Sequence, residues 1–298
     1  MFIKEFYSFI LEKLCIPAFK FRRVTYTGAQ DISDHGDEEK CWFVPLNISS
    51  AWGDIDKIRI PSILKNIPPN VYGKILEIGL GGGKIFQELC KLNPKSFGID
   101  LSLNALQSVK DGNKINANSK SLPFKNNCFE ICIVADILEH VLDQELAPTI
   151  KEISRITKQF LILDSPYKDQ IRSPIAKCME CQKEFNVYGH LRTFTKKKLR
   201  YLFSGNGFKY LSSETCGPVR RWRNKFILWC SRKLGRSYSN DYTTCPLCNG
   251  RNINPKRSFI HKILGKAIWT THIFIDSLIP NVLKPRAEII MVFEKKAS

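Results

Sequence analysis

The segment KILEIGLGGGK, residues 74 to 84, restricts the fold of this chain more than any other stretch. A short apolar run, typical of a buried strand, is followed at once by four glycines within five residues. Bare backbone at the end of a strand permits a tight turn, and it lets a ligand approach the N–H groups of the following helix. Further apolar runs then alternate with helical patterns, which indicates a parallel, doubly wound α/β sheet.

The order of these patterns predicts the domain organisation. We expect an N-terminal helical and irregular extension over residues 1–69, whose first helix docks on the protein's own core, with contact to a membrane as the alternative. A ligand-binding domain is expected over residues 70–216 and 287–298, and a basic insertion over residues 217–286. The strands are predicted over residues 74–79, 96–101, 128–136, 159–165, 208–215 and 287–295, and the helices over residues 84–93, 102–110, 142–157 and 194–204.

Three kinds of ligand compete for the glycine-rich loop. A Walker-type phosphate loop needs a glycine and a Ser or Thr where the chain has Ile78 and Ile85, and a dinucleotide fingerprint needs a third glycine at Lys84. The pattern that the chain does have is Glu77, the alternating glycines and Asp100, which follows Gly79 by 21 residues. A carboxylate at this distance suits the two hydroxyls of a ribose. A ligand with a ribose, an amino-acid tail and no pyrophosphate fits best, and that ligand is S-adenosylmethionine.

On these residues the chain resembles the class I S-adenosylmethionine-dependent methyltransferases, and among them the branch called methyltransferase type 11. The matching segments are ILEIGLGGG, FGIDLS, SLPFKNNCFEICIVADILEHV, ISRITKQFLILDSP and HLRTFTKKKLRYLFSGNGF. The resemblance implies a Rossmann-like sheet of seven strands with an antiparallel last strand. It also implies cofactor contacts: Glu77, Gly79, Gly81 and Gly83 around the methionine part, Asp100 on the ribose, Asn118, Ser121 and Leu122 near the adenine, and Ala135 and Asp136 facing the sulfonium.

Two histidines are candidates for a catalytic base. Methyl transfer from a sulfonium is an in-line displacement, and it needs a base only when the acceptor is weak, as a hydroxyl is. His140 follows the strand expected over residues 128–136, and His190 precedes the helix expected over residues 194–204. The alternative for His140 is a structural bond to neighbouring backbone, and for His190 it includes a role as a metal ligand.

Two CxxC pairs, Cys178 with Cys181 and Cys245 with Cys248, predict a metal site. Two such turns complete a closed tetrahedral zinc site. The 63 residues between the pairs exceed the usual ribbon spacing, but an antiparallel last strand would bring both pairs to the ligand-binding edge of the sheet. We therefore predict one structural zinc knuckle, with unrelated pairs or merely buried thiols as the alternatives.

The insertion carries most of the net charge of +18, because residues 217–286 contain fourteen Lys and Arg but two Asp and Glu. Its segments RRWRNKFILWCSRKLGRS and IHKILGKAIWTTHIFIDSLIPNVL interleave basic, aromatic and aliphatic residues. This composition suits a helix on an anionic membrane, RNA bound by phosphate contact and stacking, or a substrate lid with solvated basic residues.

These patterns together predict a methyltransferase that uses S-adenosylmethionine and acts on a small-molecule, lipid-linked or glycan-linked acceptor. The alternatives are an RNA methyltransferase and a cofactor-binding protein without turnover. The odd number of eleven cysteines and the absence of an export signal predict a cytoplasmic protein, with peripheral membrane contact as an option. No run of residues has the length of a membrane span.

Overall fold

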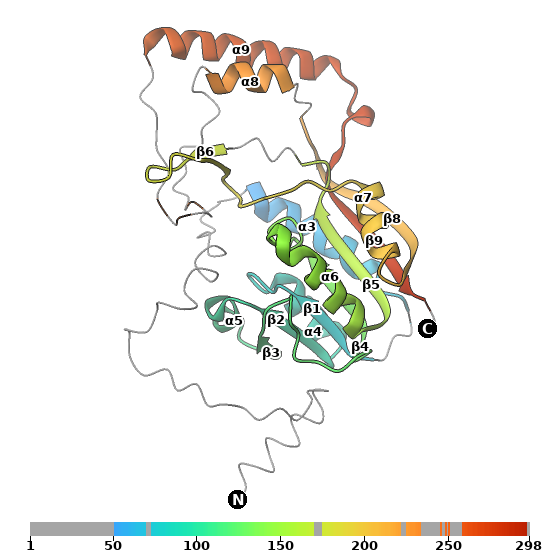
Figure 1. The fold of residues 1–298 in the computed structure, drawn as a ribbon. Helices are drawn as coiled ribbons and strands as arrows, with labels where there is room; N and C mark the ends of the chain where they lie inside the picture. The colour runs from blue at the N-terminus through green and yellow to red at the C-terminus, as the bar shows by residue number, and fades with distance from the viewer. Residues whose placement is uncertain are drawn as a thin grey trace, which may run out of the picture.

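The structure, a computed structural model, describes residues 51–69, 73–169, 175–221, 225–233, 245, 248, 250 and 258–296. At its centre lies a seven-stranded sheet in the order β3-β2-β1-β4-β5-β9-β8 (Figure 1). Its strands are β1 (Ile75–Ile78), β2 (Ser96–Asp100), β3 (Asn113–Asn116), β4 (Phe129–Ala135), β5 (Thr157–Pro166), β8 (Phe208–Val219) and β9 (Arg286–Lys295).

The first five of these strands are parallel, whereas β9 pairs antiparallel with both β5 and β8. This arrangement confirms the predicted Rossmann-like sheet of seven strands with an antiparallel last strand. It also explains the continuous apolar runs, since strands of a parallel sheet covered on both faces are buried on both sides. On β4, for example, Cys132 and Val134 face one core cluster, and Ile131 and Ile133 face the other.

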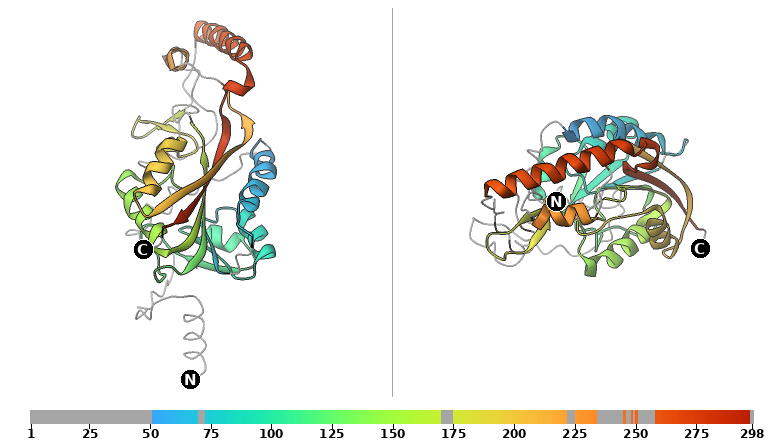
Figure 2. Two further views of the ribbon diagram at one scale, coloured as in Figure 1. Left: turned by 90° about the vertical axis from the view of Figure 1, so that its right-hand side faces the viewer. Right: turned by 90° about the horizontal axis from the view of Figure 1, so that it is seen from above.

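Helices cover both faces of the sheet (Figure 2). On one face, α3 (Ala51–Lys65) and α4 (Lys84–Leu92) bury Ile63 and Leu89 against the strands, and α5 (Leu103–Ser108) packs beside α4. On the other face, α6 (Asp143–Ile156) and α7 (Lys196–Ser204) bury Ile153 and Phe203. The predicted helices at 84–93, 102–110, 142–157 and 194–204 correspond to α4, α5, α6 and α7.

Helix α3 and strands β3, β6 (Ile175–Lys177) and β7 (Glu184–Asn186) were not predicted from the sequence. Helix α3 lies in the extension that was expected to be helical and irregular. Pro61 lies inside this helix, and a proline there obscures the helical pattern in the sequence. Strand β3 has the polar sequence NKIN at the edge of the sheet, which gives no apolar signal. A hairpin of β6 and β7 holds the first CxxC pair between its strands. The predicted helix at the N-terminus lies outside the described residues, and the domain boundaries stay a prediction.

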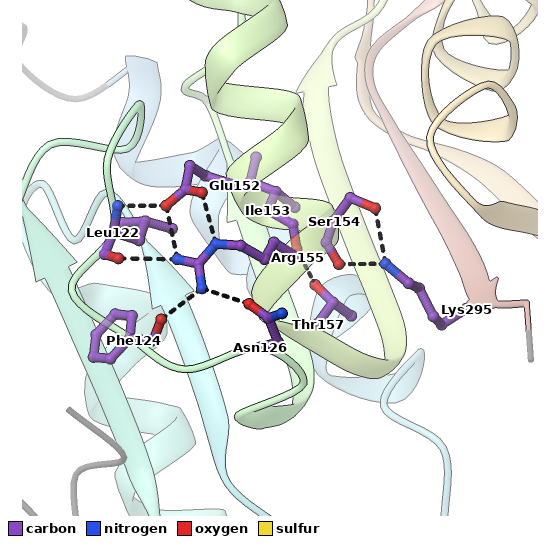
Figure 3. A network of polar contacts seen from close by, with 9 residues as sticks. All are labelled: Leu122, Phe124, Asn126, Glu152, Ile153, Ser154, Arg155, Thr157 and Lys295. Atoms are coloured by element: carbon purple, nitrogen blue, oxygen red, sulfur yellow. Dashed lines mark hydrogen bonds and ion pairs between the residues drawn. The ribbon is translucent and has the colours of Figure 1, made fainter. Parts of the chain in front are cut away.

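A polar network fixes the segment that precedes β4 onto the end of α6 (Figure 3). The guanidinium of Arg155 donates to the carbonyls of Leu122 (3.0 Å) and Phe124 (2.6 Å) and to the carboxylate of Glu152. Glu152 in turn accepts the N–H of Leu122 at 2.7 Å. The loop expected to line the adenine is therefore fixed by hydrogen bonds between its backbone and the side chains of α6. Both the N–H and the carbonyl of Leu122 are used in these bonds.

Two further helices lie beyond the ends of β8 and β9, away from the sheet (Figures 1 and 2). They are α8 (Lys225–Lys233) and α9 (Phe259–Leu278), and a short 3-10 helix, η1 (Asn281–Leu283), follows α9. Helices α8 and α9 pack against each other, and neither makes an extensive contact with another helix or strand of the described chain. Within the described ranges, no helix combines the length and the hydropathy required to cross a membrane.

Candidate functional site

The glycine loop, residues 79 to 83, joins β1 to α4 and forms the centre of the site. Gly79, Gly81 and Gly83 have φ angles of +80°, +49° and +68°, a region that favours glycine. A Cβ added to Gly79 or Gly83 would lie 2.3 Å or 2.1 Å from a neighbouring side chain, whereas at Gly81 or Gly82 it would meet nothing within 4 Å. The loop is therefore tightly packed at both ends and open in the middle, where a ligand can lie against its backbone.

Asp100, the last residue of β2, faces the open part of this loop. Its Oδ2 accepts the N–H of Gly81 at 2.9 Å, and its Oδ1 accepts the N–H of Ser102 at 2.8 Å. The Ser102 hydroxyl caps α5 by accepting the N–H of Ala105 at 3.2 Å. Because each carboxylate oxygen has a second lone pair, Asp100 can also accept hydrogen bonds from the two hydroxyls of a ribose.

Glu77 lies on β1, the strand that pairs with the Asp100-bearing strand β2. Its side chain is buried, and its Oε2 has no hydrogen-bond partner among the described residues. Burial raises the pKa of Glu77 well above its usual value, Arg59 opposes the rise, and the Asp100 charge adds to it. A buried acceptor without a donor costs free energy, so this oxygen marks a place where a ligand donor or cation fits.

Three more acidic residues form an acidic cluster beside Glu77: Asp136, Asp164 and Glu288, whose carboxylate oxygens lie within 4.8 Å of one another. Asp136 follows β4 with a φ of +51°, Asp164 lies near the end of β5, and Glu288 lies near the start of β9. Arg59 of α3 forms ion pairs with Asp136 and, at 3.4 Å, with Asp164. Burial raises the pKa of Asp164 to about 6 and that of Glu288 well above its usual value.

Nearly all buried side-chain atoms without a hydrogen bond belong to this region. Within the part of the chain that the structure describes, they come from Arg59, Glu77, Asp136, Glu139, Asp164 and Glu288, with the Thr193 hydroxyl as the exception. Three of these carboxyl groups keep an ion pair, Asp136 and Asp164 with Arg59 and Glu288 with Arg220 at 3.8 Å. Four buried carboxyl groups and the half-buried Asp136 thus share two guanidinium groups, an environment that stabilises a bound cation.

The remaining residues implied as cofactor contacts lie around the same edge. Ala135 is the buried last residue of β4, directly before Asp136. Asn118 turns the chain before Ser121, since its Oδ1 accepts the N–H of Lys120 and its carbonyl accepts the N–H of Ser121. A direct contact of Asn118, Ser121, Leu122, Ala135 and Asp136 with a cofactor stays a prediction.

The structure brings the two candidate histidines together. The rings of His140 and His190 lie edge to face with centroids 4.9 Å apart, and His190 Nδ1 lies 2.7 Å from Asp169 Oδ2. Because an ionised carboxylate only accepts, this nitrogen carries the proton and leaves Nε2 as the basic atom of a neutral ring. Burial lowers the pKa of His140 to about 3, so His140 is uncharged at neutral pH. The neighbouring Glu139 has its pKa raised by burial to about 7.

The two CxxC pairs also meet. All four Sγ atoms lie within 4.8 Å of one another, with Cys178 Sγ 3.3 Å from Cys248 Sγ and Cys181 Sγ 3.6 Å from Cys245 Sγ. These separations exceed a disulfide bond and are close to the edge of a tetrahedron with metal–sulfur bonds of about 2.3 Å, which is about 3.8 Å. The donor set and its spacing therefore fit a tetrahedral, thiolate-loving ion such as Zn²⁺.

Sequence reasoning missed Arg59, Asp164, Asp169, Arg220 and Glu288. A usable signal existed for Asp164, since it ends an apolar run just as Asp136 does, and residues at the carboxyl ends of parallel strands meet at one edge. Glu288 and Arg220 depend on the register of the antiparallel strands, which the sequence pattern does not fix.

Comparison with known proteins agrees with this geometry over part of the chain. Residues 76–160 match the family described as Methyltransferase domain. Over 85 residues the chain is 35% identical to an uncharacterized protein of Methanocaldococcus jannaschii, a stretch that covers 28% of this chain and 36% of that relative. The chain thus matches about a third of that relative's length. The residues that match the family, 76–160, contain the glycine loop, Asp100 and Asp136.

Among solved structures, the chain is similar to S-adenosylmethionine-dependent methyltransferases from Archaeoglobus fulgidus (15% identity, 82% of this chain and 99% of that chain, TM-score 0.47) and Methanosarcina mazei (17%, 80% and 98%, TM-score 0.46). It is also similar to the [4+2]-cyclase SpnF (16%, 80% and 81%, TM-score 0.48). The family match and the observed strand order together support a class I S-adenosylmethionine-dependent methyltransferase.

The raised pKa values of the buried carboxyl groups predict a contribution to stability that falls with rising pH, opposite in sign to that of His140, whose pKa burial lowers. Asp164 and Glu139, with pKa values of about 6 and about 7, bind protons more tightly in the native state than in the unfolded state, where the values are about 4. Above about pH 5 the unfolded state has already released these protons, whereas the native state holds them up to about pH 6 to 7, so the contribution of each group to the free energy of unfolding falls by about 1 to 3 kcal/mol between about pH 5 and about pH 7.5. Denaturant unfolding across this range measures the change.

Asp164→Asn removes one of these titrations and should flatten the pH dependence of stability. Glu130→Gln is the matched control, because Glu130 is paired with the exposed Lys158 at 3.0 Å and should leave that dependence unchanged. An identical pH dependence in the wild type and in Asp164→Asn would contradict the raised pKa of this buried carboxyl group.

Proposed function

We propose that the chain is an S-adenosylmethionine-dependent methyltransferase that acts on a small-molecule, lipid-linked or glycan-linked acceptor. The observation that carries the proposal is the open middle of the glycine loop, with Asp100 across it and the unpartnered oxygen of Glu77 beside it. A ribose suits Asp100, and an ammonium or sulfonium group suits the surplus of buried carboxyl groups.

The charge of the site also favours this ligand over a dinucleotide. A pyrophosphate would carry two negative charges toward Glu77 and the acidic cluster, where carboxyl groups already outnumber guanidinium groups. Like charges in a poorly solvated site repel each other strongly. A cationic ligand lowers this repulsion, so the electrostatics of the site and the missing third glycine of a dinucleotide fingerprint lead to the same conclusion.

Different residues of the chain bind different parts of the cofactor. Glu77 and the acidic cluster neutralise the positive charges of the cofactor, Asp100 orients its ribose, and the open loop lets it lie against the backbone. When bound, S-adenosylmethionine supplies a methyl group that is already activated by its sulfonium. The protein therefore has to hold the acceptor in line, exclude water and, for a hydroxyl acceptor, remove one proton.

His190 is the group we propose for that proton. Asp169 fixes its ring and its tautomer, and the uncharged His140 packs against it without competing for the proton. The imidazolium formed would be stabilised by Asp169, as in other histidine bases oriented by a carboxylate. His140 then acts through His190, as a positioning residue.

The four cysteines are proposed to hold a structural zinc ion. Cys178 and Cys245 are fully buried in a small apolar cluster of their own, and the N–H of Cys245 donates to the Gly250 carbonyl at 2.8 Å. The hairpin that carries Cys178 and Cys181 continues through Tyr188 directly to His190. A closed zinc site there would fix the position of His190.

Cofactor binding tests the central claim. Titration calorimetry should detect S-adenosylmethionine and its demethylated product, and Asp100→Ala should weaken both by about tenfold or more, because two ribose hydrogen bonds to a charged acceptor are lost. Asp111→Ala is the control, since Asp111 is exposed and lies after α5. Heat with a dinucleotide and none with the sulfonium or its product would overturn the proposal.

Turnover tests the enzyme itself. The protein is incubated with S-adenosylmethionine labelled in its methyl group and with fractionated cell extract, and we expect label in the lipid or small-molecule fraction. Label in RNA would instead support the RNA methyltransferase. Cofactor binding with no label in any fraction would support a binding protein without turnover.

The histidine proposal predicts unequal effects of two matched substitutions. His190→Gln should lower kcat by about a hundredfold or more, because general-base catalysis is lost, while cofactor binding stays unchanged. His140→Gln should have a smaller effect. The measurements are kcat for methyl transfer to the acceptor found above and calorimetry of the cofactor. Turnover that survives both substitutions would contradict the base.

The zinc proposal predicts close to one zinc ion per chain in protein purified without an affinity metal. Cys178→Ser and Cys245→Ser should each lower the zinc content strongly, because three thiolates no longer close the site. Cys230→Ser is the control, since Cys230 lies on α8 and outside the cluster. Elemental analysis measures the content, and wild-type protein without zinc would refute the site.

A further inference from the structure

The outer surface of α8, α9 and η1 is unusually apolar. Of the nineteen strongly exposed large hydrophobic side chains in the described part of the chain, eleven lie on these three elements. We call this surface the apolar face; it consists of Phe226, Trp229, Phe259, Ile260, Ile263, Leu264, Ile273, Phe274, Leu278, Val282 and Leu283. The side chain of Val282 is 89% exposed and that of Phe274 is 63% exposed, so these residues do not belong to a core of the folded chain.

The pattern along α9 shows that the exposure is one-sided. Gly265 and His272 are buried, and Ile268, Trp269, Ile275 and Asp276 are half-buried, so this set forms the inner side of the helix. The opposite side presents apolar residues at intervals of three and four: Ile260, Ile263, Leu264, Phe274 and Leu278, with Ala267, Thr270 and Thr271 between them. Among the α9 residues whose side chains the structure describes, none on this outer side is charged, which is the pattern of a helix that lies in a membrane interface.

Within the described residues, basic rather than acidic groups border the apolar face. Lys233 lies over the ring of Trp229 at 5.9 Å, and Trp229 stacks on Phe226 with ring centroids 6.0 Å apart. Arg221 lies 5.9 Å from the ring of Trp269, and Lys266 is exposed on the flank of α9. Asp276, the acidic residue of α9, is half-buried and paired with Lys284 at 3.0 Å. An apolar surface with a basic border complements an anionic bilayer.

The apolar face has a fixed place relative to the candidate site. Strands β8 and β9 are antiparallel, so the insertion leaves and re-enters the sheet at the carboxyl end of β5. The N–H of Arg220 donates to the Pro285 carbonyl at 2.8 Å, which closes this connection. The Arg220 side chain then donates to Asp169 Oδ1 at 2.8 Å, and Asp169 also holds His190. Helices α8 and α9 therefore stand over the edge that carries the site (Figure 1).

We propose that the apolar face docks on an anionic lipid bilayer and that the methyl acceptor is a lipid-linked molecule at the membrane surface. The docking surface stands on its own observations, whereas the identity of the acceptor rests on the proposed function. A second copy of the chain is a poorer occupant, because it would bring the same basic border against itself. RNA is a poorer occupant too, since the outer side of α9 offers aliphatic side chains and no cation to the phosphates.

Flotation with vesicles tests the docking surface on the full chain. The protein should float with vesicles of phosphatidylcholine and phosphatidylglycerol in a 7:3 ratio, and less well with phosphatidylcholine alone or as salt increases. The double variant Phe274→Glu with Leu278→Glu should lower binding by about a hundredfold, because charges replace two apolar side chains that would enter the bilayer. Both residues are exposed, so the variant should fold and should still bind S-adenosylmethionine by calorimetry.

Tyr201→Glu is the matched control, since Tyr201 of α7 is 81% exposed on the methyltransferase-type domain and outside the apolar face. It should float like the wild type. Failure of the wild type to bind anionic vesicles would overturn the docking surface, whatever the calorimetry shows. Two other results would also overturn the docking surface if the protein does not bind vesicles. One is a salt-sensitive complex with RNA, and the other is a dimer, seen by light scattering, that the double variant dissociates. Loss of cofactor binding in the wild type would instead overturn the proposed function alone.

Discussion

The antiparallel pairing of β9 between β5 and β8 determines where the other parts of this protein lie. Its register places Glu288 opposite Pro166 and Ile290 opposite Asp164, so the carboxylate of Glu288 meets the acidic cluster at the carboxyl end of β5. A parallel strand in the same place would start at the opposite edge and would take Glu288 and the insertion with it. The direction of one strand thus assembles the acidic cluster, the cysteines and the apolar face at one edge.

The sequence predicted the parts of the site that are local and left out those that depend on tertiary register. The glycine loop and Asp100 belong to strand ends, and their spacing alone indicated their place. The CxxC pairs were expected to meet because an antiparallel last strand was predicted, and the structure brings their sulfur atoms together, whereas a zinc ion between them stays a prediction. The role of Arg59 could not be predicted from the sequence. It lies on a helix whose sequence pattern is obscured by Pro61, and its partners lie at the ends of β4 and β5.

The surplus of buried carboxyl groups explains why α3 covers this edge of the sheet. Without Arg59, Asp136 and Asp164 would face each other in a poorly solvated site with no cation from α3. One guanidinium cannot satisfy them all, and buried oxygens of Glu77, Asp164 and Glu288 keep no hydrogen bond. The protein therefore retains an electrostatic deficit at the place where a cationic ligand would bind, as functional sites commonly do.

The insertion is attached to the domain at two separate points, and both lead to His190. At one point, Arg220 shares the carboxylate of Asp169 with His190. At the other, the cysteines of the insertion meet the hairpin whose chain continues to His190. Two attachments restrain the orientation of an element more than one does, because a single hinge still allows rotation. Helices α8 and α9 are consequently oriented with respect to His190, and a surface that docks on a bilayer needs this property if it is to present a lipid-linked acceptor to a fixed base.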